Sequence, residues 1–330
     1  MNMNDTAKIV ILDGYTINPG DNPWSRLEAL GDCTIYDRTP PELKLERARD
    51  AEILLVSKVK LDAATLSALP KLRYISMLAT GYNNVDVAAA GALGIPVSNV
   101  PAYSTESVAQ TAFALLLELA MHVGLHDAAV KDGEWVRSPD HSFWKTPLTE
   151  LDGLSLGIIG YGSIGKAVAR IGTAFGMKIL AYAPRIPLDT GNTRFVPLEE
   201  LFASADVVTL HCPQTPENGG FVDAGLLSLM KPTAYLLNLA RGGLVNEADL
   251  AQALCSGQIA GAGLDVVAHE PMLADNPLLT APNCIITPHI AWASLAARQR
   301  LTGIVAANVA SYLGATPINV VNGQYLALRI

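Results

Sequence analysis

Three ionisable side chains stand just beyond short apolar runs of the sequence and could together carry chemistry. Arg241, Glu270 and His289 each follow, within a few residues, a run that is typical of a buried strand. Open α/β sheets bind their ligands outside the carboxyl ends of the strands. A cation, a carboxylate and an imidazole at such ends can hold an anionic substrate, donate a proton and keep the donor protonated. Taken singly, each residue is more simply explained as a surface ion or as a hydrogen-bonded buried group than as part of a catalytic site.

A glycine-rich motif supplies the context for these residues. The motif GYGSIG at positions 160–165 follows a predicted strand and opens a predicted helix, as a dinucleotide-binding turn requires. Gly160 permits the tight turn, and Gly162 lets the backbone approach a pyrophosphate. The N–H groups of Ser163 and Ile164, in the first helical turn, would face the phosphates. The simpler alternative is an ordinary βα turn. With the three ionisable residues, the motif predicts hydride transfer between a nicotinamide cofactor and a small 2-keto acid.

The strand after this helix bears on the choice of cofactor. It should end in Asp or Glu if the cofactor is NAD, because a carboxylate there binds the ribose 2′-hydroxyl. This chain has Ala183 instead, followed by Pro184 and Arg185. Arg185 could contact a 2′-phosphate, or it could be an exposed surface arginine that Pro184 turns away. We therefore expect NAD(P)H to be the cofactor, with NADPH preferred.

Three separated motifs are shared with a known family. GYGSIG, ARGGLV and TPHIAW occur in the order and spacing of the D-isomer-specific 2-hydroxyacid dehydrogenases, which the chain resembles over nearly its whole length. The resemblance implies an α/β fold of two Rossmann-like, doubly wound parallel-sheet domains. Residues 1–103 and 295–330 would form a split substrate-binding domain, and residues 104–294 an inserted NAD(P)-binding domain. It also implies a homodimer.

The resemblance further assigns a role to each site residue. Arg241 would bind the substrate, His289 would act as acid and base, and Glu270 would stabilise the charged imidazole. The residues predicted to bind the cofactor are Gly160, Gly162, Ser163, Ile164, Arg185, His211, Cys212, Pro213, Ala240 and Asp265. Among these, Asp265 would contact the nicotinamide carboxamide. Cys212 is more simply a small packed residue than a nucleophile, because the chemistry needs no covalent step.

A loop in the N-terminal part is a candidate for binding the substrate carboxylate. The small-residue segment Ala79, Thr80 and Gly81 follows a predicted strand, so successive N–H groups could point at an anion. An ordinary turn is the alternative from the residues alone. In the family the backbone amides of this loop hold the carboxylate. Arg241 and His289 are the other residues expected to bind the substrate.

Two segments of the sequence indicate which branch of the family the chain resembles most. LATGYNNVD and NVPAYSTESVAQ look most like bacterial glycerate dehydrogenases, also called hydroxypyruvate reductases. The expected reaction is reduction of hydroxypyruvate or glyoxylate, and the physiological substrate and direction stay open. One alternative is an NAD(H)-sensing, corepressor-like interaction protein, although nearly every residue is used by the two domains. A formate dehydrogenase-like enzyme is another, but that branch has glutamine where this chain has Glu270.

Composition limits the remaining classes. The chain has 330 residues, a hydrophobic fraction of 50% and a formal net charge of −8, so we expect no nucleic-acid or membrane partner. The most apolar helical stretch, Thr111–Met121, contains Glu118 and is too short to cross a bilayer. We see no secretory signal at the N-terminus. The four cysteines are widely spaced, which favours a reducing cytoplasm: Cys33, Cys212, Cys255 and Cys284.

Two further groups of residues have simple explanations. His122 and His126 lie four residues apart, but no third ligand is spaced to join them, so no metal site is expected. Trp135, Phe143 and Trp144 lie in a polar segment and could belong to the core, a pocket wall or a dimer interface. We expect them to pack against a second subunit.

Alternating strand and helix patterns position these residues. Parallel βαβ units are predicted, because short apolar runs alternate with helical segments. The predicted strands are Lys8–Leu12, Glu52–Ser57, Leu72–Leu78, Pro96–Asn99, Ser155–Ile159, Lys178–Tyr182, Asp206–His211, Ala234–Leu239, Gly261–Val266 and Cys284–Thr287. The predicted helices are Asp62–Leu69, a long helix Thr105–Leu125, one beginning at Ser163, then Leu198–Ala203, Ala224–Met230, Glu247–Ser256 and Ser294–Leu313.

Overall fold

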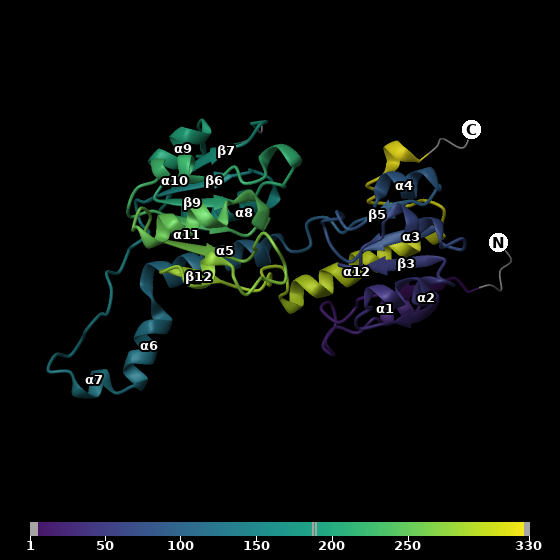
Figure 1. Ribbon diagram of the computed structural model, residues 1–330, viewed down its shortest axis with the longest axis horizontal. Helices are drawn as coiled ribbons and strands as arrows, with labels where there is room; N and C mark the ends of the chain where they lie inside the picture. Colours follow the sequence, from purple (N-terminus) through teal and green to yellow (C-terminus); the bar gives the residue numbers. More distant parts are fainter. Residues whose placement is uncertain (1–5, 187, 189, 327–330) are drawn as a thin grey trace. The chain divides into compact units, whose positions relative to one another are not determined.

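The computed structural model describes residues 6–186, 188 and 190–326 (Figure 1). Residues 1–5 lie outside this part; they belong to the N-terminal segment in which no secretory signal is predicted. Residues 327–330, at the end of the predicted substrate-binding domain, also lie outside it. The chain forms two compact units. Unit 1 comprises Met1–Ser104 with Ala293–Ile330, and unit 2 comprises Thr105–Trp292.

Unit 1 is built on a five-stranded parallel sheet in the order β2-β1-β3-β4-β5. Its strands are β1 (Lys8–Ile11), β2 (Asp32–Ile35), β3 (Ile53–Val56), β4 (Tyr74–Met77) and β5 (Val97–Ser98). All four residues of β3 and of β4 are buried, as expected for central strands covered on both faces. Strand β2 was not predicted, because this edge strand has the sequence DCTI and alternates exposed with half-buried positions.

Helices cover both faces of this sheet. They are α1 (Ser25–Glu28), α2 (Lys44–Ala48), α3 (Ala63–Ser67), α4 (Val87–Ala92) and α12 (Leu295–Leu313). Buried residues of α2, α3 and α4 share one core cluster with the strands. On the other face α12 packs beside α1 and against β4, where the rings of Tyr74 and Tyr312 stack 4.3 Å apart. A helix from the last part of the chain therefore covers one face of the N-terminal sheet.

Unit 2 is built on a seven-stranded parallel sheet in the order β12-β11-β10-β9-β6-β7-β8. Its strands are β6 (Ser155–Ile159), β7 (Lys178–Tyr182), β8 (Arg194–Phe195), β9 (Val207–Leu210), β10 (Tyr235–Asn238), β11 (Gly261–Leu264) and β12 (Cys284–Ile286). The strand order reverses between β6 and β9, as in dinucleotide-binding sheets. The predicted fold class of two doubly wound parallel-sheet domains is confirmed. Only the two-residue edge strand β8 was missed here.

Two layers of helices enclose the sheet of unit 2 (Figure 1). Helices α5 (Thr105–Met121) and α8 (Ser163–Ala174) pack on one face. Helices α9 (Leu198–Ser204), α10 (Ala224–Leu229) and α11 (Glu247–Cys255) pack on the other. Short 3-10 turns occur in both units, at η1 (Pro41–Leu43), η2 (Pro216–Asn218), η3 (Gly242–Leu244), η4 (Pro277–Leu279) and η5 (Gly323–Tyr325).

The predicted long helix Thr105–Leu125 is wrong in its C-terminal part. His122 has a φ of 47°, in the left-handed region, and the chain turns there by 56° from α5 into α6 (Val123–Lys131). The carboxylate of Glu118 reaches past the bend and accepts from the N–H of Gly124, 3.2 Å away. Helix α6 and the short α7 (Glu134–Arg137) then extend away from the sheet (Figure 1).

Helix lengths also bear on membrane insertion. In the described part of the chain, no single helix is long and apolar enough to cross a membrane. Helices α5 and α6 reach the required length and composition only when taken together, across the bend at His122. Half of α5 is buried in the core of unit 2.

Candidate active site

A histidine and a glutamate form an ion pair beyond the carboxyl ends of β11 and β12. Nδ1 of His289 lies 2.7 Å from Oε2 of Glu270, and the two side chains are 26% and 34% exposed. No hydrogen bond joins the other ring nitrogen, Nε2, to any described residue. The pairing therefore fixes the imidazole while leaving one nitrogen free to exchange a proton with a ligand.

The backbone at His289 is held in an unusual conformation by Asp265. His289 has a φ of 55°, which is strained for a residue with a side chain. The buried carboxylate of Asp265 accepts from the N–H groups of Ile290 (2.9 Å) and Ala291 (2.8 Å), and from the hydroxyl of Thr287 (2.6 Å). The sequence predicts that Asp265 contacts the cofactor. The structure adds that this carboxylate braces the turn that carries the histidine, on both sides of it.

The turn that presents Arg241 is organised by a buried asparagine. Asn238 ends β10, and its amide accepts from the N–H of Ala240 (3.1 Å) and donates to the carbonyl of Arg241 (2.9 Å). The next residue, Gly242, passes so close to the chain after β11 that a Cβ would lie 1.9 Å from the backbone of Val267. The guanidinium of Arg241 is exposed, and it makes no ion pair with any described carboxylate. Asn238 was not among the predicted site residues. The feature of the sequence that could have indicated it is a polar residue at the end of an apolar strand.

The glycine motif forms a cradle that fits a pyrophosphate. A Cβ at Gly160 would lie 2.7 Å from the backbone of His211 and Cys212, and one at Gly165 would lie 2.2 Å from the Gly160 carbonyl. A Cβ at Gly162, by contrast, would have no atom within 4 Å, so the space before α8 is open. No side chain caps the N-terminus of α8, which leaves the N–H groups of Ser163 and Ile164 to a ligand. The residues present therefore suit a dinucleotide.

The segment beside this cradle contains an uncharged histidine. Burial lowers the pKa of His211 to about 3, so its imidazole is neutral under ordinary conditions. One ring nitrogen pairs with the Thr209 hydroxyl at 2.9 Å, and the buried Nδ1 has no partner among the described residues. Burial also raises the pKa of the Cys212 thiol, in agreement with a packed residue rather than a nucleophile. Pro213, next along the chain, is exposed.

An apolar hollow lies at the carboxyl end of β7, where the adenosine of a dinucleotide would sit. It has a volume of about 270 Å³, and Tyr182, Ala183 and Phe195 contribute to its lining. Ala183 leaves this strand end without a carboxylate. Arg185 is exposed, and no described carboxylate pairs with it. The charge at this end of the sheet thus suits a phosphate better than a bare ribose diol.

In unit 1 the loop after β4 is held by its carbonyls and side chains, not by its amides. The N–H of Val100 donates to the carbonyl of Ala79 (3.0 Å), and the amide of Asn99 donates to the carbonyl of Thr80 (2.8 Å). The Thr80 hydroxyl donates to the carbonyl of Val100 at 2.7 Å. Within the described residues, the N–H groups of Ala79, Thr80 and Gly81 have no acceptor. Three adjacent free amides suit an anionic group.

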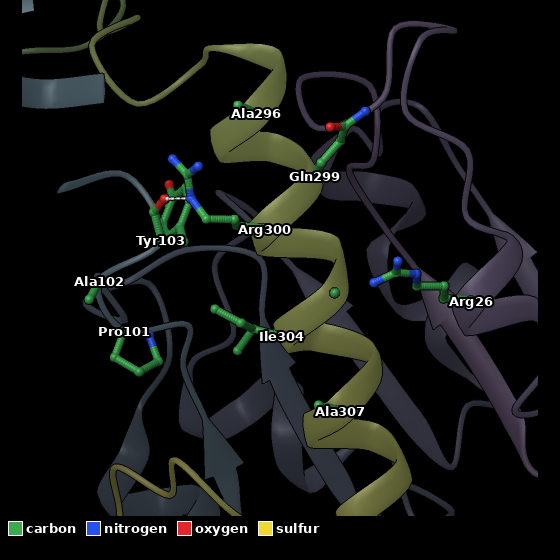
Figure 2. Close-up of a pocket in the computed structure, with 10 residues that line it drawn as sticks. Arg26, Pro101, Ala102, Tyr103, Ala296, Gln299, Arg300, Ile304 and Ala307 are labelled. Atoms are coloured by element: carbon green, nitrogen blue, oxygen red, sulfur yellow. Dashed lines mark hydrogen bonds between the residues drawn. The ribbon is translucent and has the colours of Figure 1, made fainter. Parts of the chain in front are cut away.

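Other features of the molecule do not belong to this site. His126 uses both ring nitrogens, one on the carbonyl of His122 (2.7 Å) and one on the N–H of Lys145 (3.0 Å). Among the described residues no group of metal-ligating side chains is found. An open hollow of about 750 Å³ in unit 1 is crossed by α12, with Arg26 and Arg300 on opposite sides of that helix (Figure 2). No predicted site residue lines it.

Comparison with known proteins identifies the family. The sequence profile described as "D-isomer specific 2-hydroxyacid dehydrogenase, NAD binding domain" matches residues 113–291. The chain belongs to the D-isomer-specific 2-hydroxyacid dehydrogenase family. It is an NAD(P)-dependent oxidoreductase, as its sequence predicted.

Individual members of this family resemble the chain over almost their whole length. A hydroxypyruvate reductase from Blautia hydrogenotrophica is 50% identical over 96% of this chain and 99% of its own. A glycerate dehydrogenase from Methylorubrum extorquens is 42% identical over the same shares, 96% and 99%. The solved structure of an NADPH-dependent glyoxylate/hydroxypyruvate reductase from Sinorhizobium meliloti, in complex with NADP and malonate, has a TM-score of 0.82 at 32% identity. That match covers 95% of this chain and 97% of the other. Nothing in these findings supports the alternative of a cofactor-sensing corepressor.

Proposed function

We propose that this dehydrogenase reduces hydroxypyruvate and glyoxylate to D-glycerate and glycolate. The observation that carries the proposal is the His289–Glu270 pair, 2.7 Å apart and braced by Asp265, in a chain that is 50% identical to a hydroxypyruvate reductase. A fixed imidazole with one free nitrogen can give its proton to the carbonyl oxygen of a small 2-keto acid. Oxidation of the hydroxy acid would use the same groups in reverse.

The residues divide the work of the reaction among themselves. A nicotinamide cofactor, when bound, would supply the hydride that the carbonyl carbon of the keto acid accepts. Nε2 of His289 gives its proton to the carbonyl oxygen, while Glu270 stabilises the imidazolium that precedes transfer. Arg241 and, in unit 1, the amides of Ala79–Gly81 are the groups that we propose for binding the substrate carboxylate. In this proposal unit 1 serves as the substrate-binding domain, and unit 2 as the cofactor-binding domain.

We also propose that NADPH is preferred over NADH. Ala183 lacks the carboxylate that would bind the ribose diol and repel a 2′-phosphate, and Arg185 is unpaired among the described residues. The hollow beside Ala183 would take the adenosine. Together with Gly160, Gly162, Ser163 and Ile164 at the phosphates, these residues would bind the dinucleotide. His211, Cys212, Pro213, Ala240 and Asp265 would line its nicotinamide end.

The segment of α6 and α7 supports a proposal of a homodimer. Side chains that would normally be buried are exposed there, with Trp135 at 51%, Val136 at 89% and Trp144 at 69%. The segment is ordered by its own contacts, since Lys145 pairs with Glu134 at 2.7 Å and the Trp135 indole donates to the carbonyl of His141 at 3.0 Å. Apolar surface of this kind on an ordered projection is typical of a subunit interface. Light scattering should give about twice the chain mass of 34.9 kDa, and Trp144→Glu should lower it.

A parallel assay tests the proposed activity. NADPH and NADH consumption would be followed with hydroxypyruvate, glyoxylate and pyruvate under identical conditions. We expect the highest kcat/KM with hydroxypyruvate, a lower value with glyoxylate, and little turnover of pyruvate. Failure to reduce any of these acids with either cofactor would overturn the proposal. A preference for pyruvate would overturn the assignment of the substrate while leaving the class of reaction intact.

A further inference from the structure

Asp13 places a half-buried carboxylate beyond the end of β1, at the point where the strand order of unit 1 reverses. The order β2-β1-β3-β4-β5 reverses between β1 and β3. Asp13 follows β1, and its two carboxylate oxygens accept from the N–H groups of three successive residues that follow β3. These are Ser57 (2.8 Å), Lys58 (2.5 Å) and Val59 (3.0 Å).

This arrangement has the geometry of an anion site that the protein fills by itself. Parallel sheets bind ligands outside the carboxyl ends of their strands, at the point of reversal. Successive N–H groups that converge there are a common way to hold a phosphate or carboxylate. Burial raises the pKa of Asp13, while the three amide bonds act in the opposite direction. The negative charge of Asp13 is therefore stabilised by the N–H groups of residues 57–59, and the carboxylate stabilises the conformation of that turn.

Hydrogen bonds connect this turn to the loop after β4. The carbonyl of Val59 accepts from the side-chain amide of Asn84 at 2.8 Å. The carbonyl of Asn84 accepts from the N–H of Leu61 at 2.8 Å, and the N–H of Asp86 donates back to the Leu61 carbonyl at 2.9 Å. Three bonds thus hold the two loops side by side.

The loop that is held in this way carries the three free amides. Residues 79–81 are fixed on their other side by Asn99 and Val100, through the carbonyls of Ala79 and Thr80. With its carbonyls bonded on that side and its far end bonded to the 57–61 turn, the loop has little freedom to turn its N–H groups away.

We infer that Asp13 is a positioning residue for the carboxylate-binding loop: its carboxylate serves as a built-in anion that orders residues 57–61, and through Asn84 it fixes the amides of Ala79–Gly81. The inference rests on the proposed function, in which those amides hold the keto acid. It predicts that loss of the carboxylate weakens substrate binding and leaves proton transfer by His289 and cofactor binding unchanged.

The test is Asp13→Ala with added formate. KM for hydroxypyruvate should rise about tenfold, equivalent to about 1.4 kcal/mol, with kcat within about threefold of wild type. Formate should enter the vacated amide site and restore much of the lost affinity, whereas chloride at equal ionic strength should not. Wild type should show only inhibition by formate. Hydrogen exchange should rise in residues 57–61 and 78–84 of the variant and fall again when formate is added.

A matched control is Asp62→Ala. Asp62 directly follows the 57–61 turn in the chain, but its carboxylate accepts two hydrogen bonds from Thr65, at the start of α3, and none from the N–H groups of residues 57–61 or 78–84. Its loss should lower the melting temperature without changing KM, and formate should have no effect. If Asp13→Ala does not fold, Asn84→Ala carries the test, because it removes only the bond to Val59. It should raise KM about threefold without a change in kcat, and formate should not restore it.

The outcomes separate this inference from the proposed function. Wild-type turnover of hydroxypyruvate with an unchanged KM in Asp13→Ala and in Asn84→Ala would overturn the inference alone. A higher KM with no rescue by formate would show that Asp13 acts by packing and not as an anion, which also overturns it. Absence of activity in wild type with every keto acid would overturn the proposed function, and the inference with it.

Discussion

The two parallel sheets differ in the turn that lies where their strand order reverses. Where the strand order of unit 2 reverses, the first turn is made of glycines, and the space beside Gly162 is open. Where the order of unit 1 reverses, the first turn carries Asp13, whose carboxylate takes up the available amides. The same fold rule thus creates an external anion site in one unit and an internal one in the other.

The difference teaches that residue type in the first βα turn decides what a parallel sheet can bind. Glycine leaves backbone N–H groups and volume to a ligand, whereas aspartate supplies the ligand from within the chain. In the described part of unit 1, three adjacent free amides lie one strand further along, at Ala79–Gly81. Unit 2 also carries the ionisable side chains, so it holds the proposed chemistry, while unit 1 contributes backbone donors.

The largest expected effect tests whether the proton comes from unit 2. Replacing His289 with Gln should reduce kcat by roughly 10²–10⁴-fold, the usual contribution of a positioned proton donor. Cofactor affinity should hardly change, since the glycine turn is untouched. Steady-state kinetics and a fluorescence titration with NADPH measure the two quantities. A variant that keeps more than a tenth of wild-type kcat would remove His289 from the role of acid.

The next effect tests the open turn of unit 2. In Gly162→Ala the added methyl group would occupy space that is free in the protein but needed by the pyrophosphate. Losing one charge-assisted hydrogen bond costs about 1.5–3 kcal/mol, or roughly 10–150-fold in NADPH affinity. The fold should remain intact. Gly165→Ala is the matched contrast, because its Cβ would lie 2.2 Å from the Gly160 carbonyl, so this variant should lose thermal stability as well. Equal cofactor affinity in Gly162→Ala and wild type would show that the turn does not hold phosphates.

A third effect separates charge from shape at the substrate. Lysine at position 241 keeps the positive charge but loses the planar fork that can grip two oxygens. We expect Arg241→Lys to raise KM about tenfold and to lower kcat, with cofactor binding unchanged, as for loss of one charge-assisted bond. Stopped-flow measurement of cofactor binding provides the control. Wild-type kinetics with every keto acid would make Arg241 a structural residue of the turn after β10.

The smallest expected effect concerns the end of β7 in unit 2. The double change Ala183→Asp with Arg185→Ala should shift the ratio of kcat/KM for the two cofactors toward NADH by about an order of magnitude. The added carboxylate would bind the ribose diol, and the lost guanidinium would no longer attract the 2′-phosphate. The ratio is measured with hydroxypyruvate as the fixed substrate. A wild type that strongly prefers NADH, with no shift in the variant, would mean that other residues read the ribose.

Local pattern was sufficient for much of this molecule. The buried strands were predicted from apolar runs, and the glycine turn from its place between a strand and a helix. Arg241, Glu270 and His289 were predicted to lie beyond the ends of strands, at one edge of the sheet, because parallel strands bring their carboxyl ends to one edge. The roles of these residues remain predictions, although the structure pairs Glu270 with His289 at 2.7 Å.

Other features depended on contacts that no local pattern contains. The edge strands β2 and β8 are short and half-exposed, so their residues do not form an apolar run. The bend at His122 depends on the carboxylate of Glu118 reaching Gly124 across a left-handed residue. A helical pattern continues through that point in the sequence, and only the three-dimensional path shows the break.

What the sequence by itself determined was the succession of the central strands with several of their connecting helices, and the chemical types at the strand ends, because both depend on periodicity and turn chemistry over a few residues. What only the tertiary structure decided was which carboxylate serves which turn. Asp265 braces Ile290 and Ala291, and Asp13 orders Ser57 to Val59, each across more than 20 residues of chain. The physical reason is that a buried carboxylate is stabilised by whichever N–H groups the packed sheet brings to it. The spacing of these residues in the sequence does not indicate which carboxylate will bind which N–H groups.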